Sequence, residues 1–171
     1  GKVKSIDVRI NSEGGNVFDG KAIYSLLVEN KATINVKIDG LAASAASFIA
    51  MAGDTITIGE SAFFMIHNAR MVAMGGAEDF DAAANFLRNV NRTISDTYQA
   101  RTGVKASKIK EWMDAETWFT GKEALDNGFA TSIVANKTAS NSGGIPSIWN
   151  YAKVPAELRP NRSRVTALIS M

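Results

Sequence analysis

The sequence predicts an α/β protein with a largely parallel sheet. Apolar and polar residues alternate at 6–10 and again at 34–38, as in half-buried strands. A segment with helical periodicity follows each of these stretches, and glycine-containing turns separate the two kinds of segment. Because strands that alternate with helices usually form βαβ units, parallel strand pairing is expected.

The first elements are expected in the order strand, helix, strand, helix, strand, strand. The turn at 11–15 precedes a helix with one apolar face, made by Ala22, Ile23, Leu26 and Leu27. The second strand runs into Gly40, and the alanine-rich stretch at about 43–52 predicts a short buried helix that Gly53 ends. Two further strands are expected at 56–58 and 62–66.

A longer helix is expected over 77–99. Its apolar stripe recurs at steps of three and four residues and comprises Phe80, Ala83, Leu87, Val90, Ile94 and Tyr98. Acidic residues occupy its first turn, where the helix dipole favours them, and Gly103 is a plausible stop. Short helices near 107–113 and 121–126 and a strand near 131–134 complete the pattern.

The chain divides into a body at 1–135 and a linker with a C-terminal tail at 136–171. The sequence turns to Asn, Ser, Thr and Gly after Ala135, and the aromatic tail that follows has no clear period. This tail docks either on the body or on a neighbouring subunit. Because strand-like residues are already under way at Gly1, we expect an N-terminal segment to be absent from this sequence.

Composition excludes several classes of function. A net charge of +2 with scattered Lys and Arg does not favour a nucleic-acid partner, and no apolar run approaches the roughly 18 residues of a membrane span. The chain has no cysteine and one histidine, so neither a disulfide nor a catalytic metal site is expected. No cofactor signature is present, and the absence of cysteine fits a cytoplasmic protein.

Ser44 and His67 are the candidates for nucleophilic chemistry. Ser44 lies in a run of tiny residues at 40–47, near a helix start where outward-pointing N–H groups favour negative charge. His67 ends a predicted strand, and open α/β sheets place ligands at carboxyl strand ends. A serine attacks well once a base takes its proton, which predicts a serine hydrolase. The structural alternative makes Ser44 a helix cap. In that interpretation His67 is a structural residue with satisfied hydrogen bonds, or part of a polar rim with Asn68 and Arg70.

Two further features could complete such a site. The turn at Gly14 and Gly15 follows a strand and precedes a helix, so its N–H groups could face an anion, although an ordinary strand-to-helix turn has the same pattern. The acid that orients the imidazole would be Asp114 or Glu116, which lie close together in sequence; such acids are also commonly just solvated.

Four stretches carry a resemblance to a known family. They are Ile10-Asn11-Ser12-Glu13-Gly14-Gly15, Gly40-Leu41-Ala42-Ala43-Ser44, Phe64-Met65-Ile66-His67-Asn68, and Thr120-Gly121-Lys122-Glu123-Ala124 with Asn127-Gly128. In this order they resemble the ClpP family of serine peptidases, over roughly residues 5–134. The resemblance implies the ClpP/crotonase fold, with repeated ββα units and a protruding handle helix at about 77–100.

The same resemblance assigns roles to individual residues. It implies that Ser44 is the nucleophile, His67 the general base, and Glu116 the acid, with Asp114 as the alternative. The backbone N–H groups of Gly15 and Ala45 would form the oxyanion hole. The chain departs from the family pattern at Glu13, at 45–46 and at 68–69, and in this it is similar to the ClpP-like peptidases of phages and prophages.

These features favour a serine endopeptidase that cleaves extended or unfolded polypeptides within a homo-oligomeric ring. The resemblance implies an ATPase unfoldase as partner or, for the phage-like members, capsid and scaffold proteins during head maturation. Two alternatives remain open. One is a crotonase-type acyl-CoA enzyme, which shares the fold, and the other is an inactive ring-forming assembly or scaffold protein.

Overall fold

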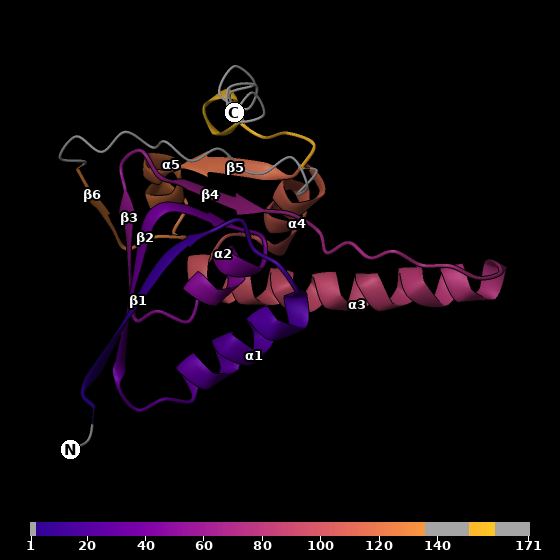
Figure 1. Cartoon of the computed structure of the whole chain (residues 1–171), viewed down its shortest axis with the longest axis horizontal. Coiled ribbons are helices and arrows are strands. Elements are labelled where there is room, and N and C mark those ends of the chain that lie inside the picture. The colour runs from indigo at the N-terminus through magenta and orange to yellow at the C-terminus, as the bar shows by residue number, and fades with distance from the viewer. Residues whose placement is uncertain (1–2, 136–150, 160–171) are drawn as a thin grey trace, which may run out of the picture.

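The computed structural model describes residues 3–135 and 151–159. These residues form a mixed α/β structure, as the alternating periodicities predicted (Figure 1). The elements are β1 (Ser5–Ser12), α1 (Val17–Val28), β2 (Thr33–Ala43), α2 (Ala45–Ala50), β3 (Thr55–Gly59), β4 (Phe63–Ile66), α3 (Ala77–Thr102), α4 (Ala106–Asp114), β5 (Thr117–Thr120), α5 (Gly121–Asp126), β6 (Ser132–Val134) and the 3-10 helix η2 (Ala156–Leu158).

The long strand β2 organises a six-stranded sheet in the order β5-β4-β2-β3-β6, with β1 paired to β2 as well. Its first half pairs with β3, and its last three residues pair with β4. Four of the five strand pairs are parallel, and only β4 and β5 are antiparallel. The carboxyl ends of β2 and β4 therefore meet at the same edge, which is where the functional candidates lie.

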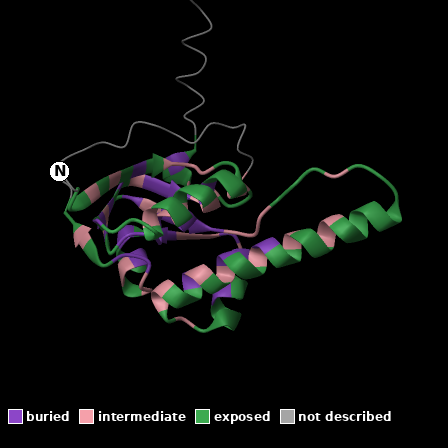
Figure 2. Ribbon diagram, turned by 90° about the horizontal axis from the view of Figure 1, so that it is seen from below, coloured by how far each residue is buried: buried purple, intermediate pink, exposed green. Residues whose placement is uncertain are grey.

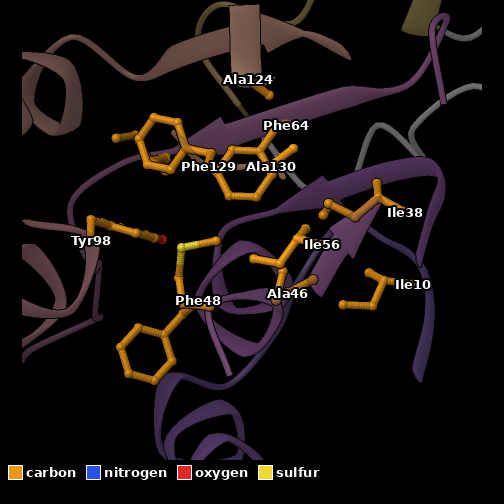
Figure 3. Packing of buried hydrophobic residues seen from close by; sticks show 14 of the residues in the cluster. Ile10, Ile38, Ala46, Phe48, Ile56, Phe64, Tyr98, Ala124, Phe129 and Ala130 are labelled. Carbon is orange, nitrogen blue, oxygen red and sulfur yellow. The ribbon is translucent and has the colours of Figure 1, made fainter. Parts of the chain in front are cut away.

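The main core lies between the sheet and the helices α1, α2 and α3, which Figure 1 shows on one side of it. Inward-facing residues of the parallel strands, such as Ile38 and Ile56, are fully buried. An aromatic cluster closes this core, with Phe129 stacked 4.9 Å from Phe64 and edge-on to Tyr98 at 5.8 Å between ring centroids (Figure 3). Burial alternates along β1, along β3 and along the first half of β2, because only one face of these stretches packs on this core, which explains their alternation of apolar and polar residues.

Helix α3 projects well beyond the sheet (Figure 1). Only Val90, Ile94 and Tyr98, in its second half, are buried, and Figure 2 shows its far end mostly exposed. The helix begins after Gly76, whose N–H donates to the Asp79 carboxylate at 2.9 Å, and ends at the left-handed Gly103. It runs three residues past the predicted end at 99.

The second face of the sheet carries a smaller apolar cluster. Leu41, Ala43 and Met65 are buried there by Leu158, which comes from the C-terminal end of the described chain. Of the two alternatives for the tail, residues 151–159 therefore dock on the body, next to β5 (Figure 1, yellow). The linker and the rest of the tail lie outside the described residues, and the boundary at 135 stays a prediction.

No helix in the described ranges is long and apolar enough to cross a bilayer.

Candidate active site

Ser44 sits on a sharp turn between β2 and α2. Its φ of 55° is left-handed, which is unusual for a residue other than glycine. Such strain persists only where the surrounding structure enforces it, and it is concentrated at functional sites. Here the N–H of Ser44 donates to the carbonyl of Met65 at 3.0 Å, while the carbonyl of Ser44 accepts from Ser47 Oγ at 2.6 Å. These two hydrogen bonds hold the backbone of Ser44 in place, and the residue lines the cavity described below.

His67 follows the last residue of β4, beside the end of β2. The register that pairs Ala43 with Met65 places the two strand ends together. As a result the Nε2 atom of His67 lies 2.8 Å from the Oγ atom of Ser44. This is hydrogen-bonding distance for a base that would accept the hydroxyl proton. The structure therefore brings together the two residues that the sequence singled out.

The Gly14-Gly15 turn lies directly against this serine. Gly14 has φ 103°, and a Cβ added to it would come within 2.6 Å of the carbonyl oxygen of Ala43 and 2.8 Å of Ser44 Cβ. Glycine is thus required for the close approach. Ala45 is the first residue of α2, so its N–H has no partner within the helix. The use of the Gly15 and Ala45 N–H groups as an oxyanion hole stays a prediction.

Glu116 is buried beneath the site with its carboxylate surrounded by donors. Its side chain is 5% exposed, and Arg70 donates to Oε2 at 2.6 Å. The backbone N–H groups of Ala152 and Lys153 donate to Oε2 and Oε1 at 3.1 and 2.8 Å, and Trp118 Nε1 makes a longer contact of 3.4 Å with Oε1. Burial alone would raise the pKa of Glu116, but these hydrogen bonds together lower it, so the carboxylate is held ionised.

Asp114, the alternative acid, is near the surface and bound elsewhere. Lys110 donates to one of its carboxylate oxygens and Asn68 to the other, at 2.5 and 2.8 Å. The bond from Lys110 lowers the pKa of Asp114, with Asn68 adding to the effect. Within the part of the chain that the structure describes, neither acid bonds to His67, whose buried Nδ1 has no hydrogen-bond partner there. The role of either acid in orienting His67 stays a prediction.

The imidazole of His67 is held neutral. Burial lowers the pKa of His67 to about 4, Arg70 lowers it as well, and Glu116 raises it in part. Glu116 is therefore close enough to act on the imidazole electrostatically while its hydrogen bonds go to other groups. A neutral imidazole can accept the hydroxyl proton, but one with so low a pKa is a weak base near pH 7.

Two contacts at the site are not evident from the sequence. Tyr151 lies edge-on to His67, with 5.4 Å between ring centroids, and its hydroxyl donates to the carbonyl of Glu13 at 2.5 Å. Burial raises the pKa of Tyr151, which a hydrogen bond with the Ser44 side chain opposes. The ion pair from Arg70 to Glu116 spans 46 residues. Tyr151 lies in a tail without periodicity and Arg70 at the surface, so the sequence does not indicate these partners.

A cavity of about 760 Å³ opens beside Ser44 and His67. Its walls are mainly apolar and come from α2, α3 and the segment after His67, and Tyr151 closes one side. Its inner lining includes Phe48, Val90, Ile94 and Tyr98. A site of this size and character suits a large apolar side chain next to the hydroxyl.

Because His67 is the only histidine, its titration can be followed without interference. We expect its imidazole NMR signals to titrate with a midpoint at about 4, well below the usual 6.5. Between these values the unfolded chain binds a proton that folded His67 does not. The free energy of unfolding should therefore rise with pH across this window, by at most about 3 kcal/mol. A midpoint at or above 6.5 would contradict the buried, neutral imidazole.

Comparison with known proteins points to one family. The model of the Clp protease family matches residues 1–137. The chain is 30% identical over 146 residues to proteolytic subunit 2 of the ATP-dependent Clp protease of Nocardia farcinica, covering 82% of this chain and 70% of that protein. It is 31% identical over 139 residues to the corresponding subunit of Pleurastrum terricola, covering 78% and 69%.

Proposed function

Since this chain belongs to the Clp protease family, as its four motifs predicted, we propose that it is a serine endopeptidase acting through Ser44 and His67. Membership of a family of serine peptidases supports the reaction class. The observation that carries the residue assignment is the distance of 2.8 Å between Ser44 Oγ and His67 Nε2 beside an apolar cavity. Neither observation depends on the other.

The proposed reaction is acyl transfer to serine followed by hydrolysis. Ser44 Oγ attacks the peptide carbonyl while His67 takes the hydroxyl proton, and the imidazolium then gives that proton to the leaving amine. Water, deprotonated by His67, attacks the acyl-enzyme and releases the carboxylic product. The N–H groups of Gly15 and Ala45 would stabilise the oxyanion of each tetrahedral intermediate.

We assign the third position of the triad to Glu116 rather than Asp114. Glu116 is buried, ionised and close enough to influence the pKa of His67, whereas Asp114 is half exposed and bonded to Lys110 and Asn68. An acid in this role holds one tautomer of the imidazole and stabilises the imidazolium. This assignment requires Glu116 to exchange at least one of its present donors for His67 Nδ1.

The substrate would be an extended polypeptide. We propose that it adds as a strand beside the Gly14-Gly15 turn and the segment 71–76, where main-chain pairing makes recognition tolerant of sequence. The cavity beside Ser44 would take one apolar side chain of this strand. Cleavage would then favour unfolded or extended chains over folded proteins.

Assembly into a homo-oligomer is proposed from the exposed apolar side chains of the projecting region. Val72 and Met74 are 97% and 95% exposed, and Phe80 and Phe86 on α3 are about half exposed. Surfaces of this kind usually mark an interaction site. A ring in the cytoplasm, with an ATPase unfoldase or phage capsid and scaffold proteins as partners, is the assembly we propose.

The direct test is peptide hydrolysis by the full chain and two serine variants. We expect Ser44→Ala to abolish cleavage of casein and of short fluorogenic peptides. Ser132→Ala, an exposed serine on β6 at the far end of the sheet, should leave cleavage unchanged (Figure 1). Cleavage that persists in Ser44→Ala would refute the assignment.

The same preparations separate the two other functions. Turnover of acyl-CoA thioesters that Ser44→Ala leaves intact would identify a crotonase-type enzyme, whose oxyanion hole needs no serine. An intact oligomer in which no variant cleaves any peptide or reacts with a serine-directed probe would identify an assembly protein.

A further inference from the structure

Residues 151–159, hereafter the C-terminal segment, contact the candidate active site next to Ser44 and His67. Tyr151 packs on the His67 ring and lines the cavity beside Ser44. Its hydroxyl donates a hydrogen bond to the carbonyl oxygen of Glu13, which directly precedes the Gly14-Gly15 turn. A strand added beside this turn would need that backbone acceptor and that space. The C-terminal segment thus lies where a substrate would bind.

The same segment also donates hydrogen bonds to the carboxylate of Glu116, the proposed triad acid. An ionised carboxylate has about four acceptor positions. Glu116 receives four donors in this structure, two of which are the backbone N–H groups of Ala152 and Lys153. No acceptor position remains for His67 Nδ1, which is buried without a partner among the described residues. The docked segment therefore accounts both for the fully bonded carboxylate of Glu116 and for the Nδ1 atom of His67, which has no partner among the described residues.

Leu158 anchors the far end of the segment in an apolar cluster. Leu158 is 2% exposed and packs against Leu41, Ala43 and Met65, the apolar patch on the second face of the sheet. Burial of a leucine side chain contributes about 2 kcal/mol. The remaining residues of η2, Ala156 and Glu157, are exposed. Val154 and Tyr151 are partly buried against the same cluster, so these two residues and Leu158 supply the apolar contacts of the segment.

We propose that the C-terminal segment is an intramolecular inhibitor, which covers Ser44 and withholds Glu116 from His67 until it is displaced. The proposal rests on the serine peptidase function proposed above. Release of the segment removes the donors from Ala152 and Lys153 and leaves two acceptor positions on Glu116. His67 Nδ1–H then has a carboxylate partner, and the cavity loses the wall that Tyr151 provides.

The low basicity of His67 is consistent with this closed arrangement. Its pKa of about 4 reflects burial and the nearby Arg70, with only partial compensation from Glu116. A direct hydrogen bond from Nδ1–H to the carboxylate favours the protonated imidazole and raises its pKa toward the working range of a general base. Displacement of the segment and activation of the base are then the same event.

The test uses the full chain and opens the segment from either end. Leu158→Asp places a charge in the apolar cluster, and Tyr151→Ala removes the ring from His67 and the hydroxyl from Glu13. Glu157→Ala, an exposed residue of the same segment, is the matched control. Two quantities are measured: the rate at which a small fluorophosphonate modifies Ser44, and amide hydrogen exchange of residues 151–154, which requires no activity.

Both opened variants should exchange faster at residues 151–154 and react with the probe about tenfold faster or more, as expected when a minor open state becomes the major one. Glu157→Ala should match the wild type in both. A synthetic peptide of residues 151–159 added to Leu158→Asp should slow the reaction again, which misfolding would not allow.

Two results would overturn the proposal. One is faster exchange with an unchanged or slower reaction at Ser44, which would make the segment neutral or supportive. The other is unchanged exchange in both variants, which would show that Leu158 and Tyr151 do not hold it. In either case, modification of Ser44 by the fluorophosphonate in the wild type would still support the proposed peptidase function. If no variant, opened or closed, reacts at Ser44, the proposed function itself fails.

Discussion

Replacing His67 with glutamine is expected to lower peptide hydrolysis by about 10⁶-fold, since loss of the triad base leaves only the oxyanion hole and substrate binding. The side chain of Gln cannot accept the proton of Ser44, whose Oγ now lies 2.8 Å from the imidazole. The chain contains no other histidine that could substitute. The measurement is kcat/KM on a fluorogenic peptide.

The fold must be shown to survive this change. The pKa of His67 is about 4, so at pH 7 the substitution exchanges one neutral side chain for another. Thermal unfolding of His67→Gln should therefore remain cooperative and close to that of the wild type. Loss of hydrolysis in a protein with unchanged unfolding assigns the effect to chemistry. A variant that retains more than about a tenth of wild-type kcat/KM would exclude His67 as the base.

Truncating Phe129 to alanine should have the largest effect on stability. Its ring is fully buried and packs within 6.0 Å, centroid to centroid, of the rings of Phe64, Tyr98, Phe119 and Trp112. Figure 3 shows it between elements far apart in the sequence. Loss of a buried phenylalanine costs about 3–5 kcal/mol, in part because the cavity cannot collapse.

Urea unfolding measures this cost, and Phe129→Leu is the matched variant. Leucine retains most of the buried volume, so its cost should be below about 2 kcal/mol. Equal and small losses for both substitutions would show that the aromatic cluster does not hold the sheet to α3 and α4.

The sequence predicted those parts of the fold that have a local period. Alternation at 6–10 and 34–38 located β1 and β2, and the stripe through Val90, Ile94 and Tyr98 located α3. Strand β5 was missed because it is only four residues long and its partner β4 lies some fifty residues earlier in the chain. Helix α2 is shorter than the predicted 43–52 because β2 continues through Ala43 and the chain already turns at 51–52.

In the candidate site, too, some residues could be predicted from the sequence and others could not. Ser44 and His67 could be found from the sequence because each closes a strand and because the chain has only one imidazole. The environment of Glu116 could not, since two of its donors are backbone N–H groups at 152 and 153. Every residue except proline carries such a donor, so side-chain identity gives no indication of the contact.

The most direct test of the peptidase assignment is to locate the adduct of a fluorophosphonate by peptide mass spectrometry. The paired hydroxyl and imidazole predict a single modified site, on the peptide that contains Ser44, in the wild type and in the opened variants. An adduct on any other serine or on Tyr151, or a chain that none of these preparations modifies, would contradict the account.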